Sequence, residues 1–327
     1  FSTSTTFPIV INPDEKGQIT LQSHPDGIGS FEDNMLFSSS DLPQGVSVVL
    51  TAQGTDENSL SGVLSGTISG EYIVNGDIEV QESDTLIILP GTRFLFDGPY
   101  GFTVAGVLKA QGTEEDSIIF DNFGSELDFS NRWRGFTLNS LTEASIFEYV
   151  RISGAYKFWA GGGVYLHSSE PIFNHVTISY NQSDDGGGMK FDYSNAILSN
   201  MVIEHNIGWN EDNIDGWGGG MSLNSSNLVV TNVLVRNNSS YWGGGIGVWQ
   251  SLPSFTNVRA TENLANDGGG GMHIYNSSDI ILTHVTLDLN HAHFGGGLNL
   301  WDSDVIITDM MIIENTADLS AGIHMGE

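Results

Sequence analysis

The second half of the chain alternates apolar and polar residues in short bursts that recur three times within each unit of sequence. The first such unit places its bursts at 164–166, 171–173 and 176–178. Alternation over a few residues, rich in Val and Ile, predicts strands with one buried face. No segment carries a helical period long enough for a helix, so the pattern predicts an all-β fold.

A run of glycines precedes each first burst and sets the length of the repeat. The apolar residues after these runs lie about 25 residues apart, with one longer interval before Met221. They are Val164, Met189, Met221, Ile246, Met272, Leu298 and Ile323. Three short strands per unit are too few for a propeller blade, and the helix of a leucine-rich repeat is missing. The pattern predicts a parallel β-helix, in which each strand pairs with its equivalent one turn later, about 4.8 Å away.

Stacked turns also explain the glycines and predict polar columns along the axis. At a glycine run the chain turns sharply and successive backbones crowd, so a Cβ atom would obstruct them. Side chains in a polar column hydrogen-bond to one another or to corner backbone. A serine column is predicted at Ser169, Ser194, Ser226, Ser251, Ser278 and Ser303. An asparagine column is predicted at Asn181, Asn206, Asn238, Asn263, Asn290 and Asn315. A third column is predicted at His175, Asn200, Asn232, Asn257, His284 and Asp309.

The regular pattern loosens toward the N-terminus, which predicts the domain organisation. Residues 67–160 read as irregular coils, and residues 161–327 as the regular coils marked by glycine. Residues 1–66 are rich in Ser and Thr and predict an N-terminal β segment or cap, because solenoids need a polar cap at each end. A parallel β-helix over 67–327 is therefore expected to follow this segment.

The glycine-containing segments resemble a known class of proteins. Residues 181–189, 263–272 and 290–300 read NQSDDGGGM, NLANDGGGGM and NHAHFGGGLNL. They are similar to the Gly-Gly-apolar repeats of bacterial surface β-helices, among them polymorphic outer-membrane proteins. The resemblance implies the right-handed parallel β-helix class with pectate-lyase-like coils. That class includes lyases, hydrolases, adhesins, phage tailspikes and structural surface proteins, so it leaves the function open.

The amino-acid composition narrows the classes of partner that the chain can bind. The chain of 327 residues carries a formal charge of −30, from 40 acidic and 10 basic residues. Such a charge argues against nucleic acid and anionic membranes as partners. There is no cysteine, which excludes disulfides and thiolate metal sites. No apolar run is long enough for a transmembrane helix. We expect an extracellular or cell-surface protein, of bacterial origin.

Two surface features are candidates for binding. Trp249, Tyr275 and Trp301 occupy the same position in consecutive coils, which predicts an outward aromatic ladder at a spacing of about 5 Å. Such rings either pack against one another or form a platform for sugar rings. The longer unit contains WNEDNIDGW, whose Glu211, Asp212 and Asp215 form either a solvated acidic loop or a calcium site.

The residues that catalysis would need are poorly represented. Enzymes of this class use calcium on aspartates with a Lys or Arg base, or two carboxylates facing one glycosidic bond. The polygalacturonase-like hydrolases of this class carry the short motifs Asn-Thr-Asp, Asp-Asp, Gly-His-Gly and Arg-Ile-Lys. Of these, only Asp-Asp occurs here, at Asp184 and Asp185. Arg236 aligns with Glu204 one coil earlier, which predicts a cross-coil salt bridge rather than a catalytic base. We therefore expect no catalytic residues.

These features favour a non-catalytic extracellular structural β-solenoid. The chain ends at AGIHMGE, part-way through another coil, and an open edge is a template for adding strands. Head-to-tail stacking of copies into a fibre or stalk is therefore expected, because heterologous contacts that do not close generate filaments. An adhesin or glycan-binding module is the alternative, followed by a polysaccharide lyase or hydrolase. No cofactor is expected apart from the calcium ion considered above.

Overall fold

The computed structural model describes residues 58–124, 130–139, 144–209 and 216–326 with their side chains, and the backbone of Phe129 and of four strands before residue 55. The chain divides into two compact units, Phe1–Ser59 and Leu60–Glu327. The described strands of the first unit form two antiparallel pairs. These pairs are β1 (Ser2–Thr3) with β2 (Leu21–Gln22) and β3 (Gly29–Ser39) with β4 (Leu42–Gly54).

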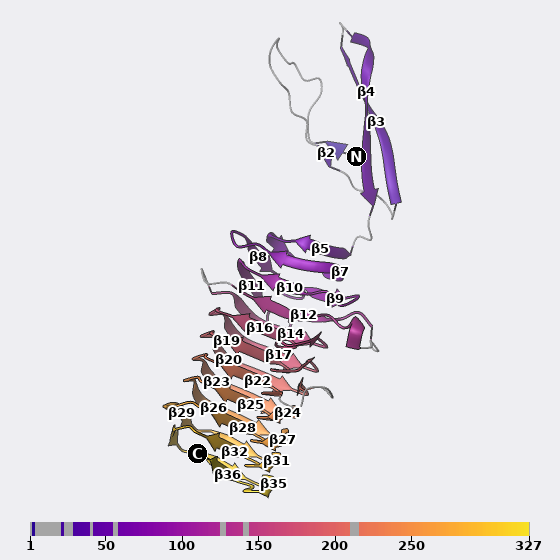
Figure 1. The fold of residues 1–327 in the computed structure, drawn as a ribbon. Coiled ribbons are helices and arrows are strands. Elements are labelled where there is room, and N and C mark those ends of the chain that lie inside the picture. The colour runs from indigo at the N-terminus through magenta and orange to yellow at the C-terminus, as the bar shows by residue number, and fades with distance from the viewer. Residues whose placement is uncertain are drawn as a thin grey trace. The chain divides into compact units, whose positions relative to one another are not determined.

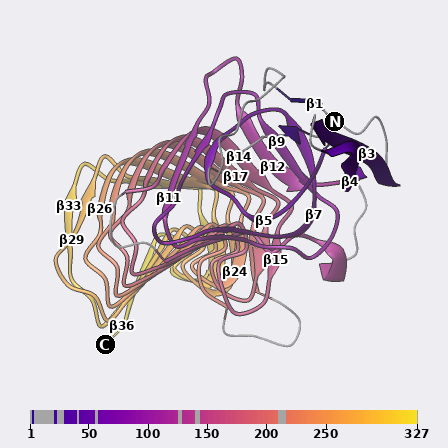
Figure 2. The same ribbon diagram turned by 90° about the horizontal axis from the view of Figure 1, so that it is seen from above.

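The second unit is a parallel β-solenoid of about ten turns with about 25 residues per coil and almost no helix. This confirms the predicted all-β fold class. Figure 1 shows the coils stacked in sequence order from β5 to β36, and in Figure 2, seen from above, successive coils have similar outlines that are displaced stepwise from one another. Each strand pairs with a strand of the next coil, as Val233 does with Val258.

The N-terminal coils are the less regular ones. Their elements are β5 (Ser59–Val63), β6 (Gly66–Ile68), β7 (Glu71–Val80), β8 (Thr85–Ile88), β9 (Arg93–Phe96), β10 (Phe102–Val104), β11 (Val107–Gln111), β12 (Ile118–Asn122), the 3₁₀ helix η1 (Phe129–Asn131) and β13 (Phe136–Leu138).

The regular coils repeat three kinds of strand. The first strands are β16 (Val164–His167), β19 (Met189–Asp192), β22 (Met221–Asn224), β25 (Ile246–Trp249), β28 (Met272–Tyr275), β32 (Leu298–Trp301) and β36 (Ile323–Gly326). The long second strands are β14 (Ile146–Ser153), β17 (Ile172–Ser179), β20 (Ile197–Glu204), β23 (Val229–Arg236) and β26 (Ser254–Thr261). Two later coils divide this strand into β29 (Ile280–Thr283) with β30 (Thr286–Asp288), and β33 (Val305–Thr308) with β34 (Met311–Ile313). The short third strands are β15 (Tyr156–Lys157), β18 (Gln182–Ser183), β21 (Ile207–Gly208), β24 (Ser239–Trp242), β27 (Leu264–Gly268), β31 (His291–Phe294) and β35 (Thr316–Leu319).

The second and third sequence bursts form one bent strand in most coils, and the short strand after them was not anticipated. The bend lies at the third predicted column, whose six residues all adopt a left-handed backbone with φ between 52° and 57°. Asn and Asp tolerate this conformation better than most residues, which accounts for their frequency there. The bend lets one strand follow two sides of the coil.

One hydrophobic core runs inside the described coils. Its side chains are the inward members of the alternating bursts, so residues of the same burst stack along the axis. The earlier coils are filled by aromatic rings, with Phe94 and Phe120 stacked at 4.8 Å and Phe147 and Phe173 at 4.7 Å. The later coils are filled mainly by aliphatic residues and methionine, with Phe191 and Phe255 among them. Continuous burial of this kind makes each coil depend on its neighbours.

The glycine runs lie where the chain leaves the short third strand and enters the next first strand. One glycine in each of five runs has a positive φ, between 57° and 70°, and it is the first glycine in four of them and the second in the run 268–271. A Cβ atom on the second glycine would meet backbone of the following coil, as at Gly219, where the carbonyl oxygen of Gly244 would be 2.3 Å away. The backbone crowding that was predicted at the glycine runs is therefore observed.

Two buried polar columns run along the coils as hydrogen-bonded ladders. In the asparagine ladder, each Oδ1 accepts the backbone N–H and the Nδ2–H of the asparagine one coil earlier, from Asn181 to Asn315. In the serine ladder, each Oγ accepts the backbone N–H of the serine one coil earlier. The member between Ser251 and Ser303 is Ser277, so the predicted Ser278 is wrong. Ser278 lies one residue too far along the turn and is exposed.

Candidate functional site

The aromatic residues singled out from the sequence lie in one column on the outer face of the first strands. Trp249 of β25 pairs with Tyr275 of β28, which pairs with Trp301 of β32. Their relative exposures are 40%, 36% and 40%, so each side chain is partly exposed to solvent. We call these three residues the aromatic column. Their outward direction follows from alternation, because the neighbouring residues Val248, Ile274 and Leu300 point into the core.

Trp217, which precedes a glycine run, widens this surface. Its ring lies 6.3 Å from that of Trp249 and 6.1 Å from that of Tyr275, measured between centroids. The backbone of Trp217 forms a parallel bridge with Trp242 one coil later, which holds it beside the first strands. In the sequence Trp217 only marked the end of an insertion, and its contact with the column could not be predicted without the fold.

A buried layer supports these rings. His273 of β28 is 2% exposed and lies under both Trp217 and Trp242, at 4.9 and 5.0 Å between ring centroids. Burial lowers the pKa of His273 to about 3, so the imidazole is neutral at physiological pH. Asn299 of β32 continues the same buried position one coil later. The indoles of Trp217 and Trp242 therefore rest on a buried imidazole.

The column continues into hydrogen-bonding residues. Trp249 pairs with Asn224 of β22, and Asn224 pairs with Asp192 of β19. The Nδ2 of Asn224 donates to the Oδ1 of Asp192 at 3.1 Å, and the Tyr165 hydroxyl donates to its Oδ2 at 2.9 Å. Burial and Asp192 raise the pKa of Tyr165 well above its usual range. Amide, carboxylate and aromatic groups thus follow one another along a single line on the surface. Asn224 and Asp192 occupy the same position after their glycine runs as Trp249 does, and a count of positions would have revealed them.

The acidic pair considered for catalysis is divided between the interior and the surface. Asp184 is fully buried at its corner, whereas Asp185 is partly exposed and forms an ion pair with Lys190 at 2.8 Å. Lys190 also lies 3.9 Å from Asp192. The two aspartates therefore do not face a common space as a catalytic pair would.

A comparison with protein families bears on the handedness of the solenoid. The family model described as the right-handed β-helix region matches residues 130–317, more than half of the chain. The chain belongs to this right-handed β-helix family. The chain is also 36% identical over 67 residues to Protein bark beetle of Drosophila melanogaster. That match covers 18% of this chain and 2% of that much longer protein. No solved structure gave a significant match. Among the described residues of the β-helix, no helix is long and apolar enough to cross a membrane.

The calcium site considered from the sequence stays a prediction with respect to the described residues of the β-helix. Glu211, Asp212 and Asp215 lie outside them. The described part contains no group of three His, Asp or Glu residues placed to hold a metal ion. His291 and His293 are each bonded to the next coil, through Thr316 and Asp318, both at 2.8 Å.

The third predicted column is bonded in part in the β-helix, and the predicted salt bridge is observed. The exposed Asn200, Asn232 and Asn257 bond from coil to coil through their amide groups. Arg236 donates to Glu204 one coil earlier, with Nη2 and Oε2 2.6 Å apart. This arginine is engaged in a surface ion pair, as the alignment of the repeats predicted.

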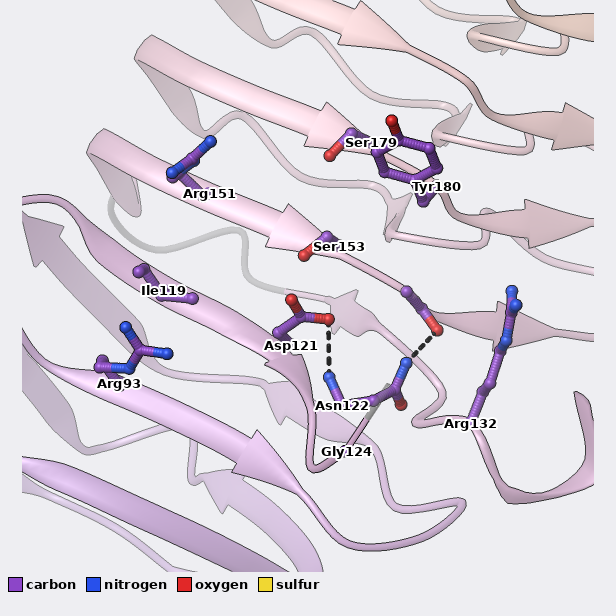
Figure 3. Close-up of a pocket in the computed structure, with 11 residues that line it drawn as sticks. Arg93, Ile119, Asp121, Asn122, Gly124, Arg132, Arg151, Ser153, Ser179 and Tyr180 are labelled. Atoms are coloured by element: carbon purple, nitrogen blue, oxygen red, sulfur yellow. Dashed lines mark hydrogen bonds between the residues drawn. The ribbon is translucent and has the colours of Figure 1, made fainter. Parts of the chain in front are cut away.

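Sequence reasoning missed the basic residues of the irregular coils. A groove of about 560 Å³ on the outer face of β9, β12, β14 and β17 contains Arg93, Arg132 and Arg151 together with Asp121. Figure 3 shows Arg93, Ile119 and Arg151 on successive strands, with Arg132 beyond Asn122. Arg93 is engaged by Glu71 of the preceding coil at 3.0 Å. The signal was present in the sequence, because six of the ten Lys and Arg residues lie between positions 93 and 157.

Proposed function

We propose that this β-helix is a non-catalytic structural element of an extracellular protein. The observation that carries the proposal is the asparagine ladder, which repeats the same buried hydrogen bonds through six coils without a break. Where every coil is bonded to the next in the same way, a pull along the axis is shared by many equivalent contacts. The chain would then act as a stiff spacer. Stacking of copies end to end stays a prediction.

A tethered full chain tests this role. We expect it to lengthen under force in steps of about 80 Å, because one coil of about 25 residues is released at a time and an extended residue spans about 3.3–3.6 Å. The same preparation is incubated with uronate and neutral polysaccharides, with calcium added, and is expected to release neither unsaturated products nor new reducing ends. Turnover on any of these polymers, or collapse of the whole chain in one low-force event, would count against the proposal.

Glycan binding is a second candidate function, favoured by the aromatic column. Half-exposed rings at successive rungs offer flat apolar faces about 4.8 Å apart along the axis. Sugar rings stack on such faces, while their hydroxyls need nearby donors and acceptors. Asn224 and Asp192 supply these groups at the next two rungs of the same line. Among the described surface residues, this combination best fits a linear oligosaccharide lying along the axis.

A triple substitution tests glycan binding. Trp249→Ala, Tyr275→Ala and Trp301→Ala are combined, and the variant is compared with the parent on a glycan array and then by calorimetry with the glycans that bind. We expect affinity to fall at least about tenfold, because each lost stacking contact is worth about 0.5–1.5 kcal/mol. Trp159→Ala, which removes an exposed indole outside the column, is the control and should bind as the parent does. Identical array profiles for parent and triple variant would remove this function.

A further inference from the structure

Lys157 stands at a position that small, buried residues occupy in the coils that follow. Its strand β15 pairs with β18, and the series continues through β21, β24, β27 and β31. The equivalent residues are Ser183, Gly208, Ser240, Ala265 and Ala292, all buried. A long cation at such a position breaks the local rule of the repeat. Departures of this kind are expected where function, rather than folding, selects the residue.

The side chain of Lys157 reaches over the outer face of the first strands. Its Nζ donates to the hydroxyl of Thr137 in β13 at 2.5 Å and lies 5.4 Å from the centroid of the Tyr165 ring. Beside it is a groove of about 500 Å³, whose lining includes Arg134, Thr103 and Thr137. Lys157 is therefore held at the wall of an open groove with a cation and two hydroxyls around it.

The positive charges of this groove have no ion-pair partner among the described residues. Neither Lys157 nor Arg134 forms an ion pair with any carboxylate that the structure describes, although the chain has 40 acidic residues. Burial and the neighbouring Arg134 lower the pKa of Lys157 from 10.5 to about 8. Two adjacent positive charges that form no ion pair repel each other, and a bound anion would relieve that repulsion.

The opposite end of the groove limits the kind of anion. Asp77 and Glu79 of β7 line it there, and Asp77 accepts the backbone N–H of Gly101 at 2.9 Å. Glu79 pairs with Thr103, which in turn pairs with Thr137, so the backbone of Glu79 lies two rungs, about 10 Å, from the threonine that binds Lys157. A polyanion extended along the groove would meet these carboxylates. The groove suits a ligand with a single anionic group.

We propose that Lys157 and Arg134 form a binding site for one tetrahedral oxyanion, a phosphate or sulfate group, either as the free ion or as a monoester. The guanidinium of Arg134 presents a fork of N–H donors and the ammonium of Lys157 a point charge. The Thr137 hydroxyl accepts from Lys157 and is free to donate its own proton to the anion. This site is separate from the aromatic column and does not depend on glycan binding there.

Calorimetric titration of the full chain with inorganic phosphate and sulfate at about pH 6.5 tests the site. We expect one saturable site, which is informative because a chain with a charge of −30 repels anions in general. Lys157→Met and Arg134→Gln should each weaken binding at least about tenfold, and Lys157→Arg should retain most of it. Lys109→Met removes a cation outside this groove and is the matched control. It should leave the affinity unchanged.

The dependence on pH separates ligand binding from a structural role. Affinity should fall as the pH rises past about 8, because Lys157 loses its proton there, and the bound anion should raise the pKa of Lys157. The lysine carbon resonances of ¹³C-labelled protein report that pKa, with Lys157→Met giving the assignment. The other ionisable groups around the groove are Arg134, Tyr165, Asp77 and Glu79. In the control Lys109→Met, anion binding should raise the pKa of Lys157 as much as it does in the parent.

Loss of folding cannot explain the expected result. The pKa of Lys157 is lower in the folded chain than its ordinary value of 10.5, so the charged form opposes folding fully below about pH 8, and this penalty disappears as the pH rises to 10.5. Lys157→Met should therefore melt at no lower a temperature than the parent at neutral pH.

The source of the anion is decided by comparing inorganic phosphate with a sugar monophosphate and a sugar monosulfate. Equal affinity for the ion and the esters supports a site for the free ion, and tighter binding of the esters supports a modified sugar. No saturable binding of any of these probes would overturn the proposal. So would equal affinities for the parent and Lys157→Met.

Discussion

Replacing Gly244 by alanine is expected to destabilise the β-helix by about 3 kcal/mol. The added Cβ atom would lie 2.5 Å from the carbonyl carbon and oxygen of Leu264 and 2.6 Å from the oxygen of Gly270. These are backbone atoms of the next coil, which is held at a spacing of about 4.8 Å by the strands on either side. The clash can therefore be relieved only by parting the two coils locally.

Urea denaturation followed by circular dichroism measures this effect as a shift of the transition midpoint. Gly101→Ala is the matched control. Gly101 has an ordinary backbone conformation, and its added Cβ would lie 3.8 Å from the nearest atom, a normal van der Waals distance. That variant should stay within about 1 kcal/mol of the parent. Equal urea midpoints for Gly244→Ala and Gly101→Ala would show that the backbone at Gly244 has room for a Cβ atom.

Removing the side chain of Asn238 is expected to cost about 3–5 kcal/mol. Its Oδ1 accepts the backbone N–H of Asn206 at 2.9 Å and the Nδ2–H of Asn206 at 3.0 Å. Its Nδ2 donates to the carbonyl of Ile203 at 2.9 Å and to the Oδ1 of Asn263 at 3.1 Å. Asn238→Ala removes all four bonds and leaves their partners buried without water.

Asn139→Ala is the control for this change, because Asn139 is exposed and outside the ladder. Its unfolding midpoint should match that of the parent. Hydrogen exchange of the Asn206 amide gives a local readout, because this amide loses its acceptor in Asn238→Ala and should exchange much faster. The amide of residue 238 donates to the Oδ1 of Asn263 and keeps its acceptor. Unchanged protection at Asn206 would mean that the ladder bonds contribute little to holding adjacent coils together.

The repeating elements were accessible to sequence reasoning because the fold places equivalent residues in equivalent environments. Val233 and Val258 pair one coil apart and point into the same core, so both positions select the same kind of residue. The same reasoning located the asparagine ladder and the aromatic column. It also predicted the salt bridge between Glu204 and Arg236.

The corners were only partly predictable. Asn200 and Asn232 adopt positive φ, and their identity signals it. Tyr193, Gln250 and Leu289 adopt positive φ as well, at 53°, 48° and 57°, although their side chains do not favour that conformation. There the stacked coils impose the turn, because the paired strands before and after it leave the chain no other path. The strain is local and is offset by pairing on both sides.

The candidate sites were also only partly predictable from the sequence. Trp249, Tyr275 and Trp301 follow the repeat and were found from it, whereas Trp217 joins them from a neighbouring corner. Lys157 lies in a coil where Ala155 occupies the position of the ladder asparagine, so the repeat did not identify its position.

The order of the residues alone therefore established the class of fold, the length of one coil, the inward positions and the two ladders. It did so because pairing between successive turns repeats every environment at a constant interval. Three further features required the folded coordinates: the choice of Ser277 over Ser278, the contact of Trp217 with the aromatic column, and the groove beside Lys157. Each depends on the path of one particular turn or on groups from different strands meeting outside the repeat, and a periodic pattern carries no information about such meetings.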